Sequence, residues 1–231
     1  MAEHSGDSYD EVAAKYADMI DEKPFTRFFE RPSYNSLLPD VAGKTVLDVG
    51  SGSGWYTARF LEQGAAVTAM DYNAEFVART RARVGERAMV VQANLAEPLG
   101  FAQNAQFDLV SAPLVMHYIK DWLPVFQEFW RVLKQNGRLV FSTHHSFTDW
   151  QQFDKDDYFA IERLEDTRDV GTVSFYRRPL TQMCADLAAA GFVIERLLEP
   201  QPLPELRKHR PDTYERLMKQ PWRLLFRAKK A

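Results

Sequence analysis

The segment from Val46 to Gly54, which reads VLDVGSGSG, constrains this chain more than any other part of it. Its first four residues are mostly apolar and include two valines, which is typical of a buried strand. Three glycines at alternate positions follow, and residues 55–63 can continue as a helix. Such a strand, turn and helix direct backbone N–H groups and a positive helix end toward a polar or anionic ligand. We therefore expect the ligand-binding turn of an α/β domain, with glycines where a Cβ would block close approach.

Alternating strand and helix patterns extend from this turn along the chain. Strands are predicted at 45–49, 65–70, 89–92, 107–112 and 138–142, and helices at 55–63, 74–84 and 121–133. The helix at 121–133 is the clearest, because its apolar residues recur at the helical period, and Asn136-Gly137 is expected to stop it. Strands that alternate with helices in this way predict a parallel sheet with helices on both faces.

The flanking segments are less regular. Residues 8–21 and 26–38 have helical spacing, with a bend or restart expected at Pro32. Residues 144–178 are rich in aromatic and acidic side chains without a helical period, and a strand is compatible with 172–176. We interpret 144–178 as a cap beside the carboxyl edge of the sheet, with a plain surface loop as the alternative. The rest of the chain is predicted as a helix at 181–190, a strand at 192–197, a Pro-rich connection at 199–211 and a last strand at 222–228.

Composition limits the function classes. The 231 residues carry a net charge of −3, with 45% hydrophobic and 26% charged residues, which fits one globular domain. The single cysteine, Cys184, excludes an internal disulfide and fits a reducing compartment. The N-terminus does not resemble a signal peptide and no apolar run is long enough for a membrane span, so we expect a cytoplasmic protein. A long basic groove with interleaved aromatics is also missing from the pattern, which disfavours nucleic acid as a partner.

Two kinds of ligand compete for the glycine turn. A dinucleotide fold prefers Gly-x-Gly-x-x-Gly, whereas the third glycine comes one residue earlier here, as Gly50, Gly52 and Gly54. Asp48 stands two residues before the first glycine, and a carboxylate there suits an ammonium group better than a pyrophosphate, which it would repel. No phosphate-loop lysine follows the glycines, which argues against a nucleoside triphosphatase.

The stretch 46–54 resembles motif I of the class I S-adenosylmethionine-dependent methyltransferases. Further elements resemble that family in the same order: Asp71 closing the second strand, Asn94-Leu95 after the third, then 107–110, 121–133, 138–142, 181–190, 192–197 and 222–228. The resemblance covers residues 41–143 closely and 179–228 more loosely. It is greatest to small-molecule methyltransferases of the ubiquinone/menaquinone-biosynthesis type.

The resemblance implies a Rossmann-like, three-layer αβα fold. Its seven-stranded, mostly parallel sheet would have an antiparallel last strand slotted between the fifth and sixth. It further implies one S-adenosylmethionine-dependent methyltransferase domain over 1–231. The expected parts are an N-terminal helical lid (1–40), a cofactor-binding half (41–143), a cap insertion (144–178) and the C-terminal half of the sheet (179–231). We expect a monomer or a homodimer.

The resemblance also implies S-adenosylmethionine as the cofactor and S-adenosylhomocysteine as its product. Asp71 stands where the family has the acidic residue that binds the ribose hydroxyls, and Leu95 would pack on the adenine. Asn94 replaces the usual Asp; its carbonyl oxygen can still accept from the adenine amino group, with a plain turn residue as the alternative. Tyr16 resembles a lid tyrosine, with a helix-core role as the alternative. The expected cofactor-binding residues are Asp48, Gly50, Ser51, Gly52, Gly54, Asp71, Tyr72, Asn94, Leu95, Ala112 and Tyr16.

Methyl transfer from a sulfonium is an in-line displacement, so the protein mainly orients two reactants and excludes water. A hydroxyl or thiol acceptor would benefit from a base, and the candidates are His117, His144 and His145. Strand alternation would turn only one of the last two toward the site. A structural role is the alternative for His117, and no metal site is expected because no familiar ligand spacing is present.

We expect a methyltransferase that acts on a small-molecule acceptor through an O, N, C or S atom. The acceptor pocket would lie between the N-terminal helices, the turn after His117 and the segment 144–178. Two alternatives are a non-catalytic regulatory protein that binds S-adenosylmethionine or a nucleotide, and a nicotinamide-dependent oxidoreductase. A second cavity beside the sulfonium would favour the enzyme over the binder. Stabilisation by NAD instead of S-adenosylhomocysteine would favour the oxidoreductase.

Overall fold

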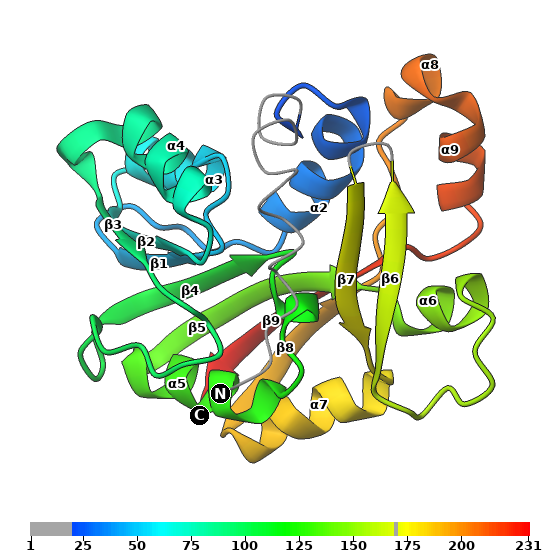
Figure 1. Ribbon diagram of the computed structural model, residues 1–231. Coiled ribbons are helices and arrows are strands. Elements are labelled where there is room, and N and C mark those ends of the chain that lie inside the picture. The colour runs from blue at the N-terminus through cyan, green and yellow to red at the C-terminus, as the bar shows by residue number, and fades with distance from the viewer. Residues whose placement is uncertain (1–19, 169–170) are drawn as a thin grey trace.

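A computed structural model describes residues 20–168 and 171–231 (Figure 1). Its centre is a seven-stranded sheet in the order β3-β2-β1-β4-β5-β9-β8. Neighbouring strands pair in parallel from β3 to β5, whereas β9 is antiparallel to both β5 and β8. The sheet strands are β1 (Thr45–Val49), β2 (Ala66–Asp71), β3 (Met89–Gln92), β4 (Phe107–Pro113), β5 (Leu133–His144), β8 (Phe192–Leu198) and β9 (Arg223–Lys230). This order confirms the predicted fold, including the place of the last strand.

Helices cover both faces of the sheet and give three layers (Figure 1). One face carries α2 (Arg31–Asn35), α3 (Trp55–Glu62) and α4 (Ala74–Val84), and the other carries α5 (Trp122–Val132) and α7 (Leu180–Ala189). Successive side chains of β1 enter the two cores in turn, Val46 with the α2–α3 layer and Leu47 with the α5–α7 layer. A strand that is buried on both faces is mostly apolar, which explains the sequence pattern before the glycine turn; the acidic residue of β1, Asp48, is buried as well.

The junction between α5 and β5 differs from the expectation. The helix ends at Val132, and Leu133 is already extended, with φ −74° and ψ 138°. The predicted stop at Asn136-Gly137 was therefore wrong: Asn136, at φ 64°, lies in the irregular start of β5, where the register with β4 shifts. An Asn-Gly pair accommodates such an irregularity as readily as a helix end, because both residues tolerate positive φ.

The N-terminal region contains two short helical segments instead of one helix over 26–38. A π-helical segment, η2 (Thr26–Glu30), leads directly into α2, which has Pro32 in its first turn. The restart predicted at Pro32 is thus found, because a proline lacks the N–H that a continuing helix would need. The expected helix at 8–21 lies almost wholly outside the described residues.

The segment 144–178 forms more regular structure than the sequence indicated. It contains α6 (Ser146–Gln152) and a hairpin of β6 (Glu162–Arg168) with β7 (Gly171–Arg177), and β7 confirms the strand suggested at 172–176. Figure 1 shows the hairpin standing beside the carboxyl edge of the main sheet. The helix was missed because α6 has only seven residues, too few to establish a period.

The segment between β8 and β9 also contains two short helices, α8 (Leu206–His209) within the predicted Pro-rich connection and α9 (Pro211–Leu217) beginning at its end. Leu206 and Leu217 bury their side chains against Phe29 of η2. Two regions that are far apart in the sequence are thereby joined at one side of the carboxyl edge. The remaining short elements are η3 (Gly85–Arg87) and η4 (Met116–Tyr118).

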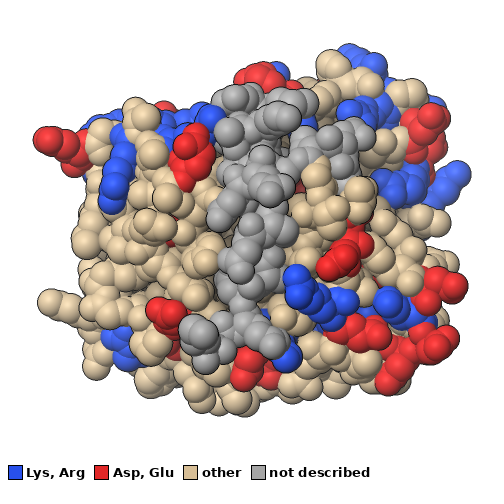
Figure 2. Space-filling model, in the orientation of Figure 1, with Lys and Arg blue, Asp and Glu red and all other residues tan. Residues whose placement is uncertain are grey.

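The molecular surface carries both signs of charge. On the face shown in Figure 2, basic and acidic side chains intermix around the margin of the molecule. Across residues 20–168 and 171–231, none of the helices has the length and apolarity needed to cross a bilayer.

Candidate functional site

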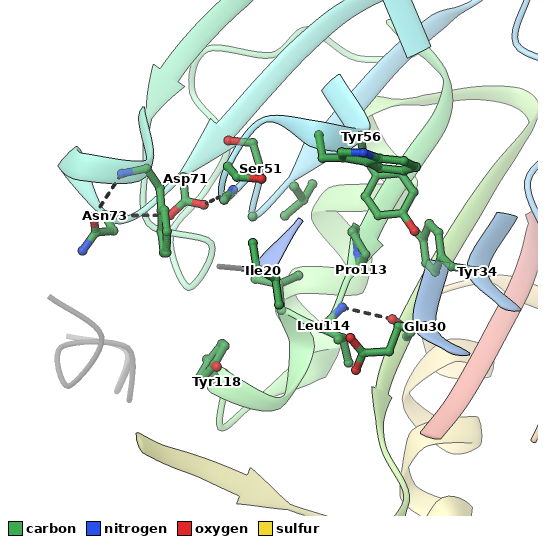
Figure 3. Close-up of a pocket in the computed structure, with 18 of the residues that line it drawn as sticks. Ile20, Glu30, Tyr34, Ser51, Tyr56, Asp71, Asn73, Pro113, Leu114 and Tyr118 are labelled. Carbon is green, nitrogen blue, oxygen red and sulfur yellow. Dashed lines mark hydrogen bonds between the residues drawn. The ribbon is translucent and has the colours of Figure 1, made fainter. Parts of the chain in front are cut away.

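An open cavity lies at the carboxyl ends of β1, β2, β4 and β5, where open α/β sheets bind their ligands. Figure 3 shows Ser51, Asp71 and Asn73 on one side of it and Glu30, Tyr34 and Leu114 on the opposite side. We call the first side the glycine lobe; its lining includes Gly50, Ser51, Gly52, Asp71, Tyr72 and Leu95. We call the second side the histidine lobe; its lining includes Glu30, Tyr34, His117, Tyr118, His144 and Arg223. The two lobes belong to one continuous cavity.

The backbone of the turn after β1 packs closely against neighbouring parts of the chain. The N–H groups of Gly50 and Ser51 both donate to the carbonyl of Met70, at 2.8 and 3.0 Å, which ties the turn to the end of β2. Gly50 has φ +68°, and a Cβ there would lie 2.9 Å from Cβ of Val115. Gly54 does not line the cavity; a Cβ on it would lie 3.0 Å from Cα of Thr80 in α4. Gly50 therefore shapes the cavity, whereas Gly54 lets α3 pack against α4.

Asp71 organises the glycine lobe. Its Oδ2 accepts from the N–H of Gly52 at 2.9 Å, and its Oδ1 accepts from the N–H of Asn73 at 3.0 Å. Burial raises the pKa of Asp71 to about 6, and the backbone N–H groups act against that rise. The carboxylate is thus fixed by the turns after β1 and β2 while it lines the cavity, and each oxygen can accept further hydrogen bonds.

Asp48 is buried beneath the turn and does not itself line the cavity. Its Oδ2 accepts from the Thr57 hydroxyl at 2.5 Å, and its Oδ1 is a buried oxygen with no hydrogen-bond partner. Burial raises the pKa of Asp48 to about 7. A buried carboxyl oxygen without a partner is costly, so this position favours an incoming donor or cation.

Four other expected cofactor residues have different settings. Tyr72 and Leu95 line the cavity, whereas Asn94 and Ala112 do not. Oδ1 of Asn94 accepts from the N–H of Ala96, which is the turn role considered as its alternative. The N–H of Ala112 donates to the Tyr34 hydroxyl at 3.1 Å. Tyr16 lies outside the described residues.

The histidine lobe is built from paired side chains. Glu30 Oε1 accepts from Nε and Nη2 of Arg223, at 3.1 and 2.9 Å, and both side chains are largely buried. The Tyr34 hydroxyl donates to the carbonyl of Val140 at 2.8 Å, so Tyr34 is fixed against the sheet. Leu114 holds a left-handed φ of 53°, stabilised by hydrogen bonds from its N–H to the Oγ and the carbonyl of Ser142.

The three candidate histidines divide into two groups. His117 and His144 line the cavity, and their rings stack at 4.2 Å between centroids. His145 points elsewhere: its Nε2 lies 2.7 Å from Glu199, and its Nδ1 accepts from the N–H of Thr148 at the start of α6. The expectation that only one of His144 and His145 faces the cavity matches this alternation. Within the described chain, no group of three or more His, Cys, Asp or Glu side chains is arranged to hold a metal ion.

Several lining residues were not identified from the sequence. Asn73 and Phe76 flank Asp71 in the glycine lobe, and Glu30 and Arg223 face each other in the histidine lobe. Asn73 has a local signal, because its side chain accepts from the N–H groups of residues 75 and 76 as a helix cap. Glu30 and Arg223 have no local signal in the sequence, since 193 positions separate them.

Comparison with known proteins agrees with this geometry. A family model described as a methyltransferase domain matches residues 47–141, which contain the glycine turn and Asp71. Among solved structures, a proposed S-adenosylmethionine-dependent methyltransferase from Listeria monocytogenes has a TM-score of 0.78 and 26% sequence identity, with 87% of this chain and 96% of that chain covered.

Two sequence relatives differ in how far they extend. An uncharacterized protein of Haemophilus influenzae is 27% identical over 194 residues, which cover 74% of this chain and 76% of that protein. The ubiquinone biosynthesis O-methyltransferase of Xanthomonas oryzae pv. oryzae is 33% identical over 115 residues, 49% of this chain and 48% of that protein. The chain thus spans about half the length of this O-methyltransferase.

Proposed function

Because this chain belongs to the class I S-adenosylmethionine-dependent methyltransferases, we propose that it methylates a small molecule held in the histidine lobe. The glycine lobe would hold the donor. The observation that carries the proposal is that both lobes form one cavity, so that two reactants can meet in it. A protein that only binds S-adenosylmethionine has no need for the second lobe.

The glycine lobe and the carboxylate beneath it fit the parts of the donor. The turn after β1 leaves open space at Gly52, where the backbone can approach the ligand, whereas the space beside Gly50 is filled by Val115. Asp71 would accept from the ribose hydroxyls, which a fixed carboxylate does well. The partnerless oxygen of Asp48 suits the methionyl ammonium, either directly or through a water molecule. Leu95 would pack against the adenine, and Tyr72 lies beside Asp71.

The donor supplies an activated methyl group, and the chain's own residues position the two reactants. Asp71 and the turn after β1 fix the donor on one side, and Glu30 and Tyr34 line the space for the acceptor on the other, with Tyr118 also in the lining. An aromatic lining excludes water, which favours a step in which the sulfonium charge disappears. His117 and His144 are candidates to accept a proton, since they line the cavity and His145 does not.

Ligand-dependent thermal stability followed by a transfer assay tests the proposal. S-adenosylmethionine and S-adenosylhomocysteine should raise the melting temperature, and NAD should not. Labelled methyl groups should then appear on a small molecule in a substrate screen. Stabilisation by NAD alone would support the oxidoreductase instead. Stabilisation by S-adenosylhomocysteine with no acceptor found in any screen would support the regulatory binder.

A further inference from the structure

The two histidines of the histidine lobe are held rigidly. His144 ends β5 and His117 lies in η4, and their ring planes differ by only 17° at a centroid separation of 4.2 Å. Phe175 of β7 packs edge-on against both rings, at 4.5 Å from His144 and 6.0 Å from His117. Both histidines are almost fully buried yet line the cavity. Their orientation is therefore fixed from two directions, and only part of each ring reaches the ligand space.

A carboxylate lies near Nδ1 of His144. Oδ2 of Asp149, in α6, lies 3.6 Å from Nδ1 of His144, and both side chains are close to 10% exposed. This separation is long for a hydrogen bond, but contacts between catalytic groups are often long before the reactants bind and then tighten. A carboxylate at Nδ1 favours the tautomer with its proton on Nδ1, which leaves Nε2 as the basic nitrogen.

An arginine, Arg223, lies opposite His144 on the neighbouring strand. Arg223 is the cross-strand partner of His144 in the β5–β9 register, so the two side chains project from the same face of the sheet. The guanidinium of Arg223 binds Glu30 of η2. The ionisable groups described around His144 are thus Asp149 from α6, His117 from η4 and Arg223 from β9, with Glu30 behind Arg223. The carboxylate of Asp149 can balance the positive charge that develops on the ring when His144 accepts a proton.

The charges of the lining also limit the acceptor. Arg223 is paired with Glu30, and Arg31, the other arginine of the described lining, is paired with Asp21 and stacks over Trp55 at 3.9 Å. Glu30 therefore neutralises Arg223, whereas Asp21 is shared by Arg31 and Arg83. An anionic acceptor would have to compete for these cations, which favours an uncharged acceptor.

From this arrangement we propose that the acceptor is an uncharged hydroxyl compound whose proton is taken by His144, with Asp149 as the residue that positions His144. The inference rests on the proposed function. In the step, the acceptor oxygen forms a bond to the methyl carbon while the bond from that carbon to the donor sulfur breaks. The hydroxyl proton passes to Nε2 of His144, and the sulfur keeps the electron pair of the broken bond. The products are a methyl ether, S-adenosylhomocysteine and a protonated His144, which then releases its proton to solvent.

The tautomer of His144 can be measured without any acceptor. The chain has five histidines, so protein labelled with nitrogen-15 histidine gives few NMR signals, and a His144→Gln variant assigns the one of interest. In the complex with S-adenosylhomocysteine near neutral pH, His144 should be neutral with its proton on Nδ1. Asp149→Asn should shift the proton toward Nε2. A proton on Nε2 in the wild type, or a spectrum that Asp149→Asn leaves unchanged, would overturn the proposal.

Glu199 offers a matched control. It forms the neighbouring histidine–carboxylate pair with His145, outside the cavity, and its side chain is 57% exposed. Glu199→Gln should leave the His144 signal in place. A change there equal to that of Asp149→Asn would show that the tautomer follows general packing, and would contradict a specific role for Asp149.

The acceptor class is tested with four probes of one size: phenol, aniline, thiophenol and benzoate. With labelled donor, methylation of phenol should exceed that of the others. His144→Gln should lower phenol methylation by about 100-fold and Asp149→Asn by about tenfold. Preference for aniline, thiophenol or benzoate would overturn the proposal, and so would a lack of phenol methylation by protein that S-adenosylhomocysteine stabilises. A protein that S-adenosylhomocysteine does not stabilise would refute the proposed function itself, which is a separate outcome.

Discussion

The two lobes of the cavity are constructed differently. The glycine lobe is made by main-chain turns after β1, β2 and β3, all within residues 50–95, and its central carboxylate is held by backbone N–H groups. The histidine lobe is made by side chains from η2, α2, η4, β5 and β9, with Glu30 and Arg223 brought together across 193 positions. Main-chain geometry resists change, whereas paired side chains can be exchanged in pairs. We infer that the fold determines how the donor is bound and that the side chains of the histidine lobe determine which acceptor is bound.

The largest effect is expected at the carboxylate of the glycine lobe. Asp71→Asn removes the charge that would accept from two ribose hydroxyls. Charge-assisted hydrogen bonds of this kind contribute about 1.5–3 kcal/mol each. Calorimetric titration should therefore show affinity for S-adenosylhomocysteine reduced by about 100-fold. Asp108→Asn is the control, because Asp108 binds Thr45 and Lys134 away from the cavity and should leave the affinity unchanged.

A smaller effect is expected where the turn contacts its neighbour. Gly50 and Gly43 share a φ of +68°, but a Cβ on Gly50 would meet Val115 at 2.9 Å and one on Gly43 would meet nothing within 4 Å. Gly43→Ala should lower the free energy of unfolding by about 1 kcal/mol from backbone strain alone. Gly50→Ala should lower it by about 2–3 kcal/mol and weaken S-adenosylhomocysteine binding as well. If denaturant titrations show the same loss of unfolding free energy in Gly43→Ala and Gly50→Ala, the contact with Val115 does not affect stability.

Asp48 should make stability depend on pH. Its pKa is raised in the folded protein to about 7 by burial, so the folded state binds a proton more tightly than the unfolded state. This contribution to stability is fully present below the unfolded pKa of about 4 and is lost as pH rises to about 7. Between pH 6 and 7 alone, the ligand-free protein should lose about 1 kcal/mol.

Asp48→Asn should make the stability of the protein less dependent on pH. The same variant also tests whether Asp48 takes part in donor binding. Binding of the donor's ammonium favours the ionised carboxylate, so wild-type affinity for S-adenosylhomocysteine should increase as pH rises through 7. The variant should bind more weakly and without this dependence. An unchanged affinity in the variant would remove Asp48 from the donor site.

The smallest effect is expected from the ion pair of the histidine lobe. In a double-mutant cycle, Glu30→Gln and Arg223→Gln should show a coupling of about 1 kcal/mol in unfolding free energy, because both side chains are mostly buried. The exposed pair of Arg27 and Glu22 should show almost none. Affinity for S-adenosylhomocysteine should be the same in all four proteins of the Glu30–Arg223 cycle. A loss comparable to that of Asp71→Asn would mean that the two lobes are not separate in function.

The sequence predicted features that arise from local patterns. The glycine turn, the apolar strand before it and the periodic helix α5 all appear within a few residues, and the sheet order follows from a resemblance that covers those residues. The short helices α6, α8 and α9 were not predicted from the sequence, because four to seven residues are too few to show a helical period. The contact of Glu30 with Arg223 was also invisible, since it depends on η2 packing against the far end of the chain.

The most direct test of the two-lobe account is a crystal structure of the complex with S-adenosylhomocysteine. The account predicts ribose hydroxyls within hydrogen-bond distance of Asp71, the ammonium above Asp48, and the sulfur directed toward His144 and Glu30. A nucleoside bound in the histidine lobe, or a sulfur that points away from it, would contradict the account.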